Sequence, residues 1–186
     1  MSQEGIIKVG VAGVRGYKGF ETARLIARHP NFRVAMIASD VMAGHRLRDL
    51  DRDFVRDGNA QAVGYDDLVS AARDYGVELM FLATEPEVCA DLGGKLIDAK
   101  VRVMDMSGAH ALKDARAHAE TYGFTWPEAA KTAVFGLTEH QEANHRLDCS
   151  QQHFTERLVQ HDQTDKRHHA DQHRRRTHQV PDEREY

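Results

Sequence analysis

The feature that most constrains the fold is a strand-like run followed by a glycine-rich turn and a helix-like segment within residues 6–29. Residues 6–12 are apolar and rich in β-branched side chains, a pattern typical of a strand buried on both faces of a sheet. Glycines follow at regular intervals, and apolar residues then recur at helical spacing up to Arg28-His29-Pro30. This order suits a dinucleotide site, because glycine lets the backbone approach a pyrophosphate whose charge the N–H groups of the helix start can bind.

The glycine spacing leaves an alternative open. Gly13-x-x-Gly16-x-x-Gly19 differs from the common G-x-G-x-x-G pattern, and a glycine-rich turn also occurs between a strand and a helix in other α/β proteins. The strand before the turn and the helix after it favour nucleotide binding over this alternative.

Strand-like and helix-like segments alternate through residues 1–140. Further strands are predicted at 32–38, 77–83 and 101–106, and 41–64 is predicted to be polar and irregular. One helix is predicted to start at an Asp66 N-cap and to close at Gly76, and another to carry Val88, Leu92 and Leu96. Repeated β–α alternation predicts an α/β protein with a Rossmann-type doubly wound parallel sheet.

Residues 141–186 have a different composition. They contain seven of the twelve histidines, many Gln and Arg residues, no glycine and few large apolar side chains. Such a segment cannot bury enough apolar surface to offset its ordering entropy, so a disordered tail is predicted. Two sharper alternatives are metal binding by His168, His169, His173 and His178, and nucleic-acid binding by residues 174–176. The tail has eight Lys/Arg against nine Asp/Glu and no recognisable ligand spacing, which disfavours both.

Overall composition excludes several classes of protein. The net charge of -4 gives no electrostatic basis for binding nucleic acid or an anionic membrane. Two cysteines, Cys89 and Cys149, form no disulfide framework, and neither a signal peptide nor a membrane span is recognisable. We expect a soluble cytoplasmic protein with no bound metal.

Several stretches resemble N-acetyl-gamma-glutamyl-phosphate reductase, a semialdehyde-dehydrogenase-type enzyme of arginine biosynthesis. They cover residues 7 to about 140, and the order and spacing of the Gly-Tyr-x-Gly turn and the Tyr-Gly-Phe…Phe-Gly-Leu pair separate this family from aspartate-semialdehyde dehydrogenase. The stretches are Gly13-Val14-Arg15-Gly16-Tyr17-Lys18-Gly19, Arg28-His29-Pro30, Phe81-Leu82-Ala83-Thr84, Met104-Asp105-Met106-Ser107-Gly108-Ala109, Leu112-Lys113-Asp114, Tyr122-Gly123-Phe124 and Val134-Phe135-Gly136-Leu137-Thr138-Glu139.

The resemblance implies an NADP-dependent reduction. In the family a cysteine thiolate attacks an acyl phosphate, phosphate leaves, and NADPH reduces the thioester to a semialdehyde. The dinucleotide is the expected partner, and the family forms homo-oligomers. The expected cofactor contacts are Gly13, Val14, Arg15, Gly16, Tyr17, Gly19, Ser39, Asp40, Ala83, Thr84 and Ser107.

The chain departs from the family at the catalytic segment. The family's Asn-Pro-Gly-Cys-Tyr-Pro-Thr stretch is not recognisable after Gly136-Leu137-Thr138-Glu139, and neither is the substrate domain that supplies the base. Cys149, between Asp148 and Ser150, is the one candidate nucleophile nearby and is interpreted as a free surface thiol. No intact catalytic residue is therefore predicted, and an acyl-phosphate substrate is expected only for an intact enzyme. A frameshift or replaced end after residue 140 is a hypothesis for this change.

Two further departures lie inside the matched region. Asp40 stands where many relatives have arginine, and its carboxylate would accept from a ribose 2′-OH and repel a 2′-phosphate, so NAD is a possible cofactor beside NADP. His110 and Ala111 replace an aromatic residue and an arginine, and His110 is predicted to be a partly exposed loop residue.

Three functions remain open from the sequence. The chain could be a working acyl-phosphate reductase, a truncated and inactive dinucleotide-binding form of it, or an NADP(H)-sensing or assembly module without catalysis. The missing cysteine segment favours the inactive form.

Overall fold

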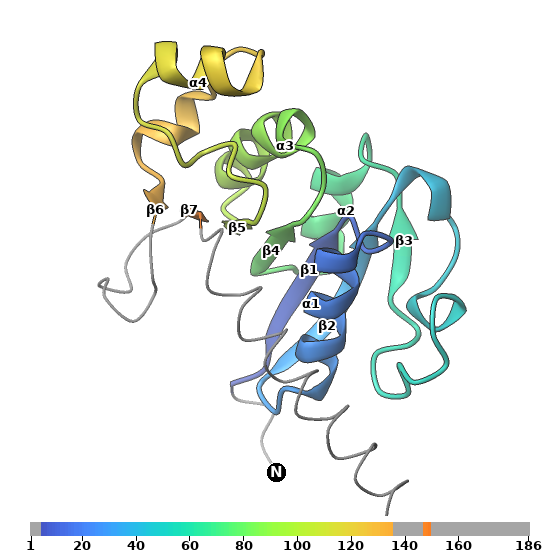
Figure 1. The fold of residues 1–186 in the computed structure, drawn as a ribbon. Coiled ribbons are helices and arrows are strands. Elements are labelled where there is room, and N and C mark those ends of the chain that lie inside the picture. Colours follow the sequence, from blue (N-terminus) through green and yellow to red (C-terminus); the bar gives the residue numbers. More distant parts are fainter. Residues whose placement is uncertain (1–4, 136–146, 150–186) are drawn as a thin grey trace, which may run out of the picture. The chain divides into compact units, whose positions relative to one another are not determined.

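The computed structural model describes residues 5–135 and 147–149 (Figure 1). Helices and strands alternate in the order β1 Ile7–Ala12, α1 Tyr17–Arg28, β2 Phe32–Ala38, the 3₁₀ turns η1 Asp40–Met42 and η2 Leu47–Asp49, β3 Gln61–Val63, α2 Leu68–Asp74, β4 Leu79–Leu82, α3 Pro86–Asp98, β5 Arg102–Asp105, α4 Ala115–Tyr122, the 3₁₀ helix η3 Glu128–Lys131, β6 Val134–Phe135 and β7 Leu147–Cys149.

The strands form one sheet in the order β3-β2-β1-β4-β5-β7-β6, and each neighbouring pair is parallel. The chain runs outward from β1 to β3 on one side and from β4 to β5 on the other, where β7 then lies between β5 and the edge strand β6, so the strand order reverses between β1 and β4. Ligands of doubly wound sheets bind outside the carboxyl ends of the strands at such a reversal. The predicted Rossmann-type sheet is confirmed.

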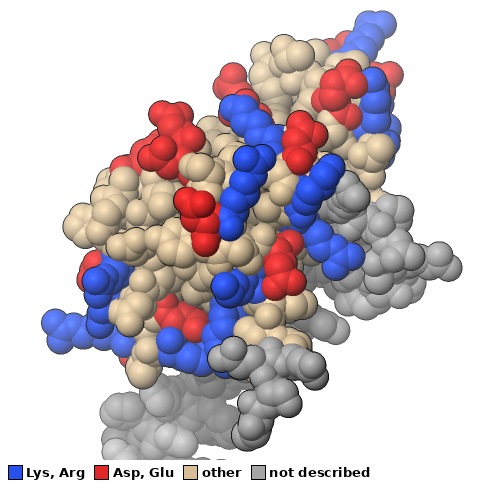
Figure 2. All heavy atoms as spheres, turned by 180° about the vertical axis from the view of Figure 1, so that it is seen from behind, with Lys and Arg blue, Asp and Glu red and all other residues tan. Residues whose placement is uncertain are grey.

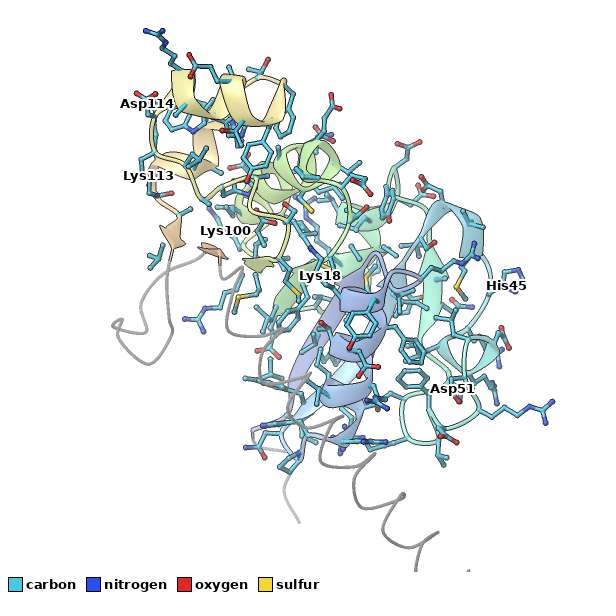
Figure 3. All side chains as sticks on the ribbon, in the orientation of Figure 1. Lys18, His45, Asp51, Lys100, Lys113 and Asp114 are labelled. Carbon is cyan, nitrogen blue, oxygen red and sulfur yellow. The ribbon has the colours of Figure 1, made fainter. Side chains whose placement is uncertain are left out.

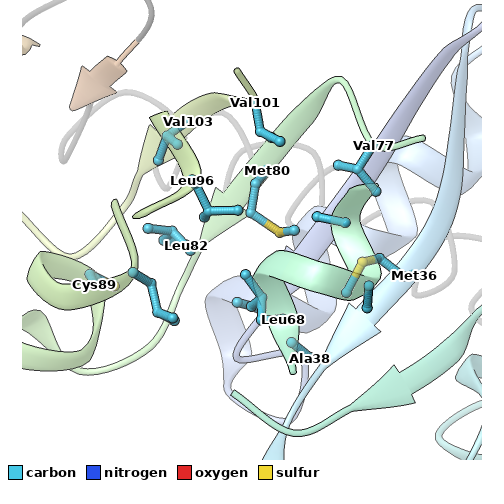
Figure 4. Packing of buried hydrophobic residues seen from close by; sticks show 14 of the residues in the cluster. Met36, Ala38, Leu68, Val77, Met80, Leu82, Cys89, Leu96, Val101 and Val103 are labelled. Carbon is cyan, nitrogen blue, oxygen red and sulfur yellow. The ribbon is translucent and has the colours of Figure 1, made fainter. Parts of the chain in front are cut away.

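The core lies between the sheet and the helices α2 and α3 (Figure 4). Met36, Ala38, Met80 and Leu82 project from alternate positions of β2 and β4 and are fully buried there. They pack in one cluster with apolar residues of the two helices, such as Leu68, and each large apolar side chain contributes roughly 1.5–3 kcal/mol by burial. The helix α1 contacts β1, β2 and β4, with Ala23 and Ile26 buried.

The observed elements differ from the predicted ones in four places. The strand β3 lies inside the stretch predicted to be irregular, and α4 was not predicted at all. The helix α2 begins at Leu68 with Asp67, not Asp66, at its N-cap, and Asp67 forms no side-chain cap bond. Of the segment predicted to be a tail, the structure describes only Leu147–Cys149, and these residues pair with β5 and β6. The rest of that segment lies outside the described residues, and the boundary at residue 140 stays a prediction.

Charged side chains of both signs are interspersed on the described part of the face shown in Figure 2. No helix among the described residues is both long and apolar enough to cross a membrane.

Candidate functional site

A cleft of about 420 Å³ opens at the carboxyl ends of β1 and β4, where the strand order reverses. The loops that follow β1, β2, β3, β4 and β5 and the first turns of α1 and α3 form its walls. Its lining residues are Gly13, Arg15, Gly16, Tyr17, Lys18, Ser39, Tyr65, Ala83, Thr84, Glu85, Pro86 and Ser107.

Gly13 shapes the turn that leads from β1 into α1. Its φ is +79°, a left-handed conformation that favours glycine, and an added Cβ would lie 2.5 Å from the carbonyl oxygen of Ala83. An added Cβ on Gly19 would collide with the carbonyl of Gly13. Close contacts with the protein's own backbone therefore explain why both of these residues are glycine.

Gly16 has no such internal reason to be glycine. Its φ is -74° and ψ 155°, which any residue adopts, and the nearest atom to an added Cβ is 3.4 Å away. Gly16 is also the N-cap of α1 and lines the cleft. A side chain at this position would enter the space in front of the helix start.

The start of α1 carries uncompensated positive potential. No side chain caps the helix, and its first turn contains no acid, so the dipole faces the cleft without a protein anion. Arg15 and Lys18 line the same side of the cleft, whereas Glu85, the N-cap of α3, lines the other. The α1 side therefore suits an anion.

Lys18 connects this helix to the segment after β5. Its ammonium donates to the carbonyl oxygen of Met106 at 2.8 Å and is half-buried. Ser107, which follows, lines the cleft. Figure 3 shows Lys18 at the start of α1.

The Asp105 carboxylate organises the segment that carries Ser107. The backbone N–H and hydroxyl of Ser107 donate to Oδ1 at 2.7 and 2.6 Å, and the backbone N–H and ring Nδ1 of His110 lie 3.2 and 2.8 Å from Oδ2. Burial by itself would raise the pKa of Asp105, but the hydrogen bonds from His110 and Ser107 outweigh it and hold the pKa below its ordinary value.

His110 is fully buried, so the prediction of a partly exposed loop residue was wrong. Two features allow the ring to be buried. The Asp105 carboxylate forms a hydrogen bond with the ring Nδ1. Gly93 on α3 leaves space for the ring, since a Cβ at this position would lie 2.7 Å from it. The ring therefore packs against bare helix backbone.

Aromatic and imidazole donors hold the other side of the same loop. Tyr122 Oη donates to the carbonyl of Gly108 at 3.1 Å, and Trp126 Nε1 donates to the carbonyl of Leu112 at 2.9 Å. His118 Nε2 lies 3.1 Å from the carbonyl of Ala109. This arrangement gives the Tyr122-Gly123-Phe124 stretch a structural role, since α4 holds the loop that reaches the cleft.

Lys113 and Asp114 fix this α4 unit at its base (Figure 3). The ammonium of Lys113 donates to the carbonyls of Ala130 and Ala133, at the end of η3. Asp114 caps α4 by accepting from the backbone N–H of Ala117 at 2.7 Å. Both residues therefore stabilise the loop rather than face the cleft.

Tyr65 closes the cleft on the β2 side. Its hydroxyl lies 3.4 Å from Thr84 Oγ1, and its backbone N–H donates to Asp40 Oδ1 at 2.8 Å. Asp40 is exposed and adjoins the cleft through Ser39, which lines it. The carboxylate of Asp40 is thus directed at the backbone of residue 65.

The structure brings most of the expected contact residues to one cleft. Gly13, Arg15, Gly16, Tyr17, Ser39, Ala83, Thr84 and Ser107 line it, whereas Val14, Gly19 and Asp40 do not. Val14 is fully buried beneath the turn. Lys18, Tyr65, Glu85 and Pro86 line the cleft and were not singled out. Lys18 and Pro86 carry a sequence signal, since each lies in the first turn of a helix that follows a strand.

The two cysteines lie in different settings. Cys89 is buried in α3, where desolvation, with the nearby charge of Asp105, raises the pKa of its thiol to about 12. Cys149 is in β7, in register with Asp105 of β5, and its side chain is not among the described ones. Within residues 5–135 and 147–149, no group of three His, Cys, Asp or Glu side chains is placed to hold a metal ion, and the tail histidines lie outside this range.

Comparison with known proteins gives a consistent match. Residues 8–147 match the family model "Semialdehyde dehydrogenase, NAD binding domain", somewhat beyond the expected limit near residue 140. N-acetyl-gamma-glutamyl-phosphate reductase of Pseudomonas putida is 37% identical over 146 residues, which are 76% of this chain and 41% of that protein. The Pseudomonas aeruginosa enzyme of the same name is 39% identical over 140 residues, 72% of this chain and 39% of that protein.

The chain thus spans about two fifths of the length of these curated relatives. Among solved structures, aspartate semialdehyde dehydrogenase with NADP from Candida albicans is similar with a TM-score of 0.50. It is 14% identical, and the match covers 77% of this chain and 42% of that one, which supports the fold.

Proposed function

Since the chain belongs to the semialdehyde dehydrogenase NAD-binding domain family, we propose that its cleft binds a nicotinamide dinucleotide with the diphosphate at the start of α1. The relatives' names further support a place in the reduction of N-acetyl-glutamyl phosphate to the semialdehyde. When bound, the dinucleotide supplies the hydride for such a reduction. This chain's own residues bind it and fix its orientation.

Gly16 is the observation that carries this proposal. Its backbone conformation and its surroundings tolerate a side chain, yet it stands at the N-cap facing the cleft. A ligand that must approach the backbone closely explains the absence of a side chain, and a diphosphate at an uncapped helix start is such a ligand.

The test is Gly16→Val. The backbone conformation of Gly16 suits any residue and a Cβ has room there, so we expect the free energy of unfolding to fall by no more than about 1 kcal/mol, because valine is a poorer N-cap than glycine. Affinity for NADPH, measured by titration calorimetry, should in contrast fall at least about tenfold. The matched control is Gly94→Val, since Gly94 on α3 also has open space at its Cβ and does not line the cleft. Equal affinity in wild type and Gly16→Val would refute the assignment of the site.

We propose NADP(H) as the ligand, with NAD(H) competing because of Asp40. The carboxylate accepts from the N–H of Tyr65 and adjoins Ser39, which lines the cleft, so its negative charge opposes a 2′-phosphate bound near Ser39. Asp40→Asn keeps an oxygen for that N–H and removes the charge. A single exposed charge is worth up to ~1 kcal/mol, so the NADP(H)-to-NAD(H) affinity ratio should rise roughly threefold. An unchanged ratio would show that Asp40 does not influence the ribose end.

We further propose that the 186-residue chain does not catalyse the reduction by itself. Cys89 is buried with its thiol protonated, and Cys149 lacks the proline and glycine neighbours of the family's cysteine segment. A thiolate, a base and a substrate must be held in register, and displaced geometry costs orders of magnitude in rate. Phosphate-dependent NADPH formation from N-acetyl-glutamate semialdehyde should stay at background in wild type and in Cys149→Ser. Activity lost with Cys149→Ser would overturn this proposal.

A further inference from the structure

Lys18 links the glycine turn at the start of α1 to the segment that follows β5. Its backbone belongs to the first turn of α1, while its ammonium reaches the carbonyl of Met106 beyond the end of β5. The bond to Met106 uses one of three donor hydrogens, and the side chain lines the cleft. The ammonium can therefore donate to a bound anion while it remains attached to the protein.

The order of the strands gives the cleft a direction. In doubly wound dinucleotide-binding sheets, the adenosine ribose lies near the residue that ends the second strand, which here is the position of Ser39 and Asp40. Since β5 lies on the opposite side of β1 and β4 from β2, the nicotinamide half must extend toward Ser107. Lys18, bonded to Met106, lies on this second side of the glycine turn.

The charges along the cleft agree with this direction. Arg15 precedes Gly16, whereas Lys18 follows it and points toward β5. Glu85, at the start of α3, is the only acid among the described residues that line the cleft. A diphosphate with one phosphate near Gly16 and the other toward Met106 would then meet a cation at its second phosphate.

We propose that Lys18 binds the nicotinamide-side phosphate of the diphosphate bridge, and this inference rests on the proposed dinucleotide function. The same ammonium also donates to the carbonyl of Met106, next to Ser107, which lines the cleft on the β5 side. One side chain would therefore bind the second phosphate and position the part of the cleft that faces the nicotinamide.

The experiment compares two ligands that differ in this phosphate. 5′-AMP carries only the adenosine-side phosphate, and ADP-ribose carries both. For Lys18→Met, affinity for ADP-ribose should fall about tenfold while affinity for 5′-AMP changes less than about twofold, because a charge-assisted hydrogen bond is lost only with the first ligand. Lys18→Arg should keep most of the ADP-ribose affinity.

Lys8→Met is the matched control. Lys8 also donates its ammonium to a backbone carbonyl, that of Tyr75 at 3.2 Å, but it lies near the amino end of β1 and does not line the cleft. The salt dependence separates binding from a purely structural role. The slope of log affinity for ADP-ribose against log salt should become shallower in Lys18→Met and stay as in wild type in Lys8→Met.

Each outcome decides the assignment. An equal loss for 5′-AMP and ADP-ribose would overturn it, since the charge would then act on the adenosine-side phosphate or on the whole turn. A lower affinity for ADP-ribose with an unchanged salt dependence would mean that Lys18 acts only on the structure of the protein, through its bond to Met106, and does not bind the phosphate. If wild type binds neither these ligands nor NADPH, both this inference and the proposed function fail. If wild type binds and Lys18→Met binds equally well, only the Lys18 inference fails.

Discussion

His110 Nδ1 lies 2.8 Å from Asp105 Oδ2, and neither side chain has any exposed surface. The same carboxylate also accepts two bonds from Ser107 and one from the backbone of His110. A single buried acid therefore fixes the segment that leads from β5 to the cleft wall. The imidazole supplies a donor to this acid that an aromatic hydrocarbon ring at the same position would lack.

Asp105→Asn should destabilise the protein at neutral pH. The amide presents one oxygen where the carboxylate presents two, so a buried donor loses its partner, and we expect the free energy of unfolding to fall by about 2–4 kcal/mol. Asp91→Asn is the control, because Asp91 forms only an exposed pair with Lys95 and should cost less than about 1 kcal/mol.

The lowered pKa of Asp105 predicts that the effect of this substitution on stability depends on pH. The folded pKa of Asp105 lies below its ordinary value of 3.8, so its ionised form stabilises the fold above that pH, and this stability is lost as pH falls through the folded pKa. The stability difference between wild type and Asp105→Asn, measured by urea unfolding, should shrink as pH falls below about 4. A difference that grows in acid would contradict the hydrogen-bonded carboxylate.

Gly93 and Gly94 are neighbours on α3 that should respond in opposite directions to alanine. A Cβ at Gly93 would lie 2.7 Å from the His110 ring, so Gly93→Ala should destabilise by about 1–3 kcal/mol. Nothing lies within 4 Å of a Cβ at Gly94, and Gly94→Ala should stabilise by up to about 1 kcal/mol through helix propensity. Thermal unfolding of the two variants measures both effects, and a stabilised Gly93→Ala would mean that His110 does not pack there.

The strands and the turn could be read from the sequence because their signals are local. The apolar run at 32–38 is β2, and the glycines at 13, 16 and 19 mark the turn into α1. The strand β3 has three residues, one of which is exposed, so it lacks a hydrophobic run. In α4 the buried side chain is His118, a residue that does not indicate a core face.

The missed site residues depend on segments that are distant in the sequence. Lys18 matters because Met106 is near, and Tyr65 because it meets both Asp40 and Thr84. The burial of His110 depends on the missing side chain of Gly93 and on the geometry of Asp105. Residue type and spacing do not reveal such pairings, so the sequence located the cleft but not all of its walls.

Lys100 ends α3 in a conformation that suits glycine. Its φ is +67°, its N–H bonds to the carbonyl of Ile97, and the N–H of Val101 bonds to the carbonyl of Leu96. Gly76 ends α2 with the same φ and the same bond pattern. Lys100→Gly should therefore stabilise by roughly 0.5–1 kcal/mol in urea unfolding, as left-handed strain is removed. Gly76→Lys should destabilise by a similar amount, and no change in either variant would contradict the strain.

Cys89 should be unreactive in the folded protein. Burial, with the nearby charge of Asp105, raises the pKa of its thiol to about 12, and the thiolate is the reactive form. In a Cys149→Ser background, Ellman's reagent at pH 8 should react with Cys89 at least about 100-fold more slowly than after unfolding in urea. The same shift predicts a pH dependence of stability. Between pH 9.0, the ordinary pKa of the thiol, and about pH 12, the folded protein keeps this proton while the unfolded chain loses it. Stability should therefore fall as pH rises through that window, and Cys89→Ala should remove that part of the alkaline loss. Rapid labelling of the folded protein at pH 8 would show that Cys89 is accessible and ionised.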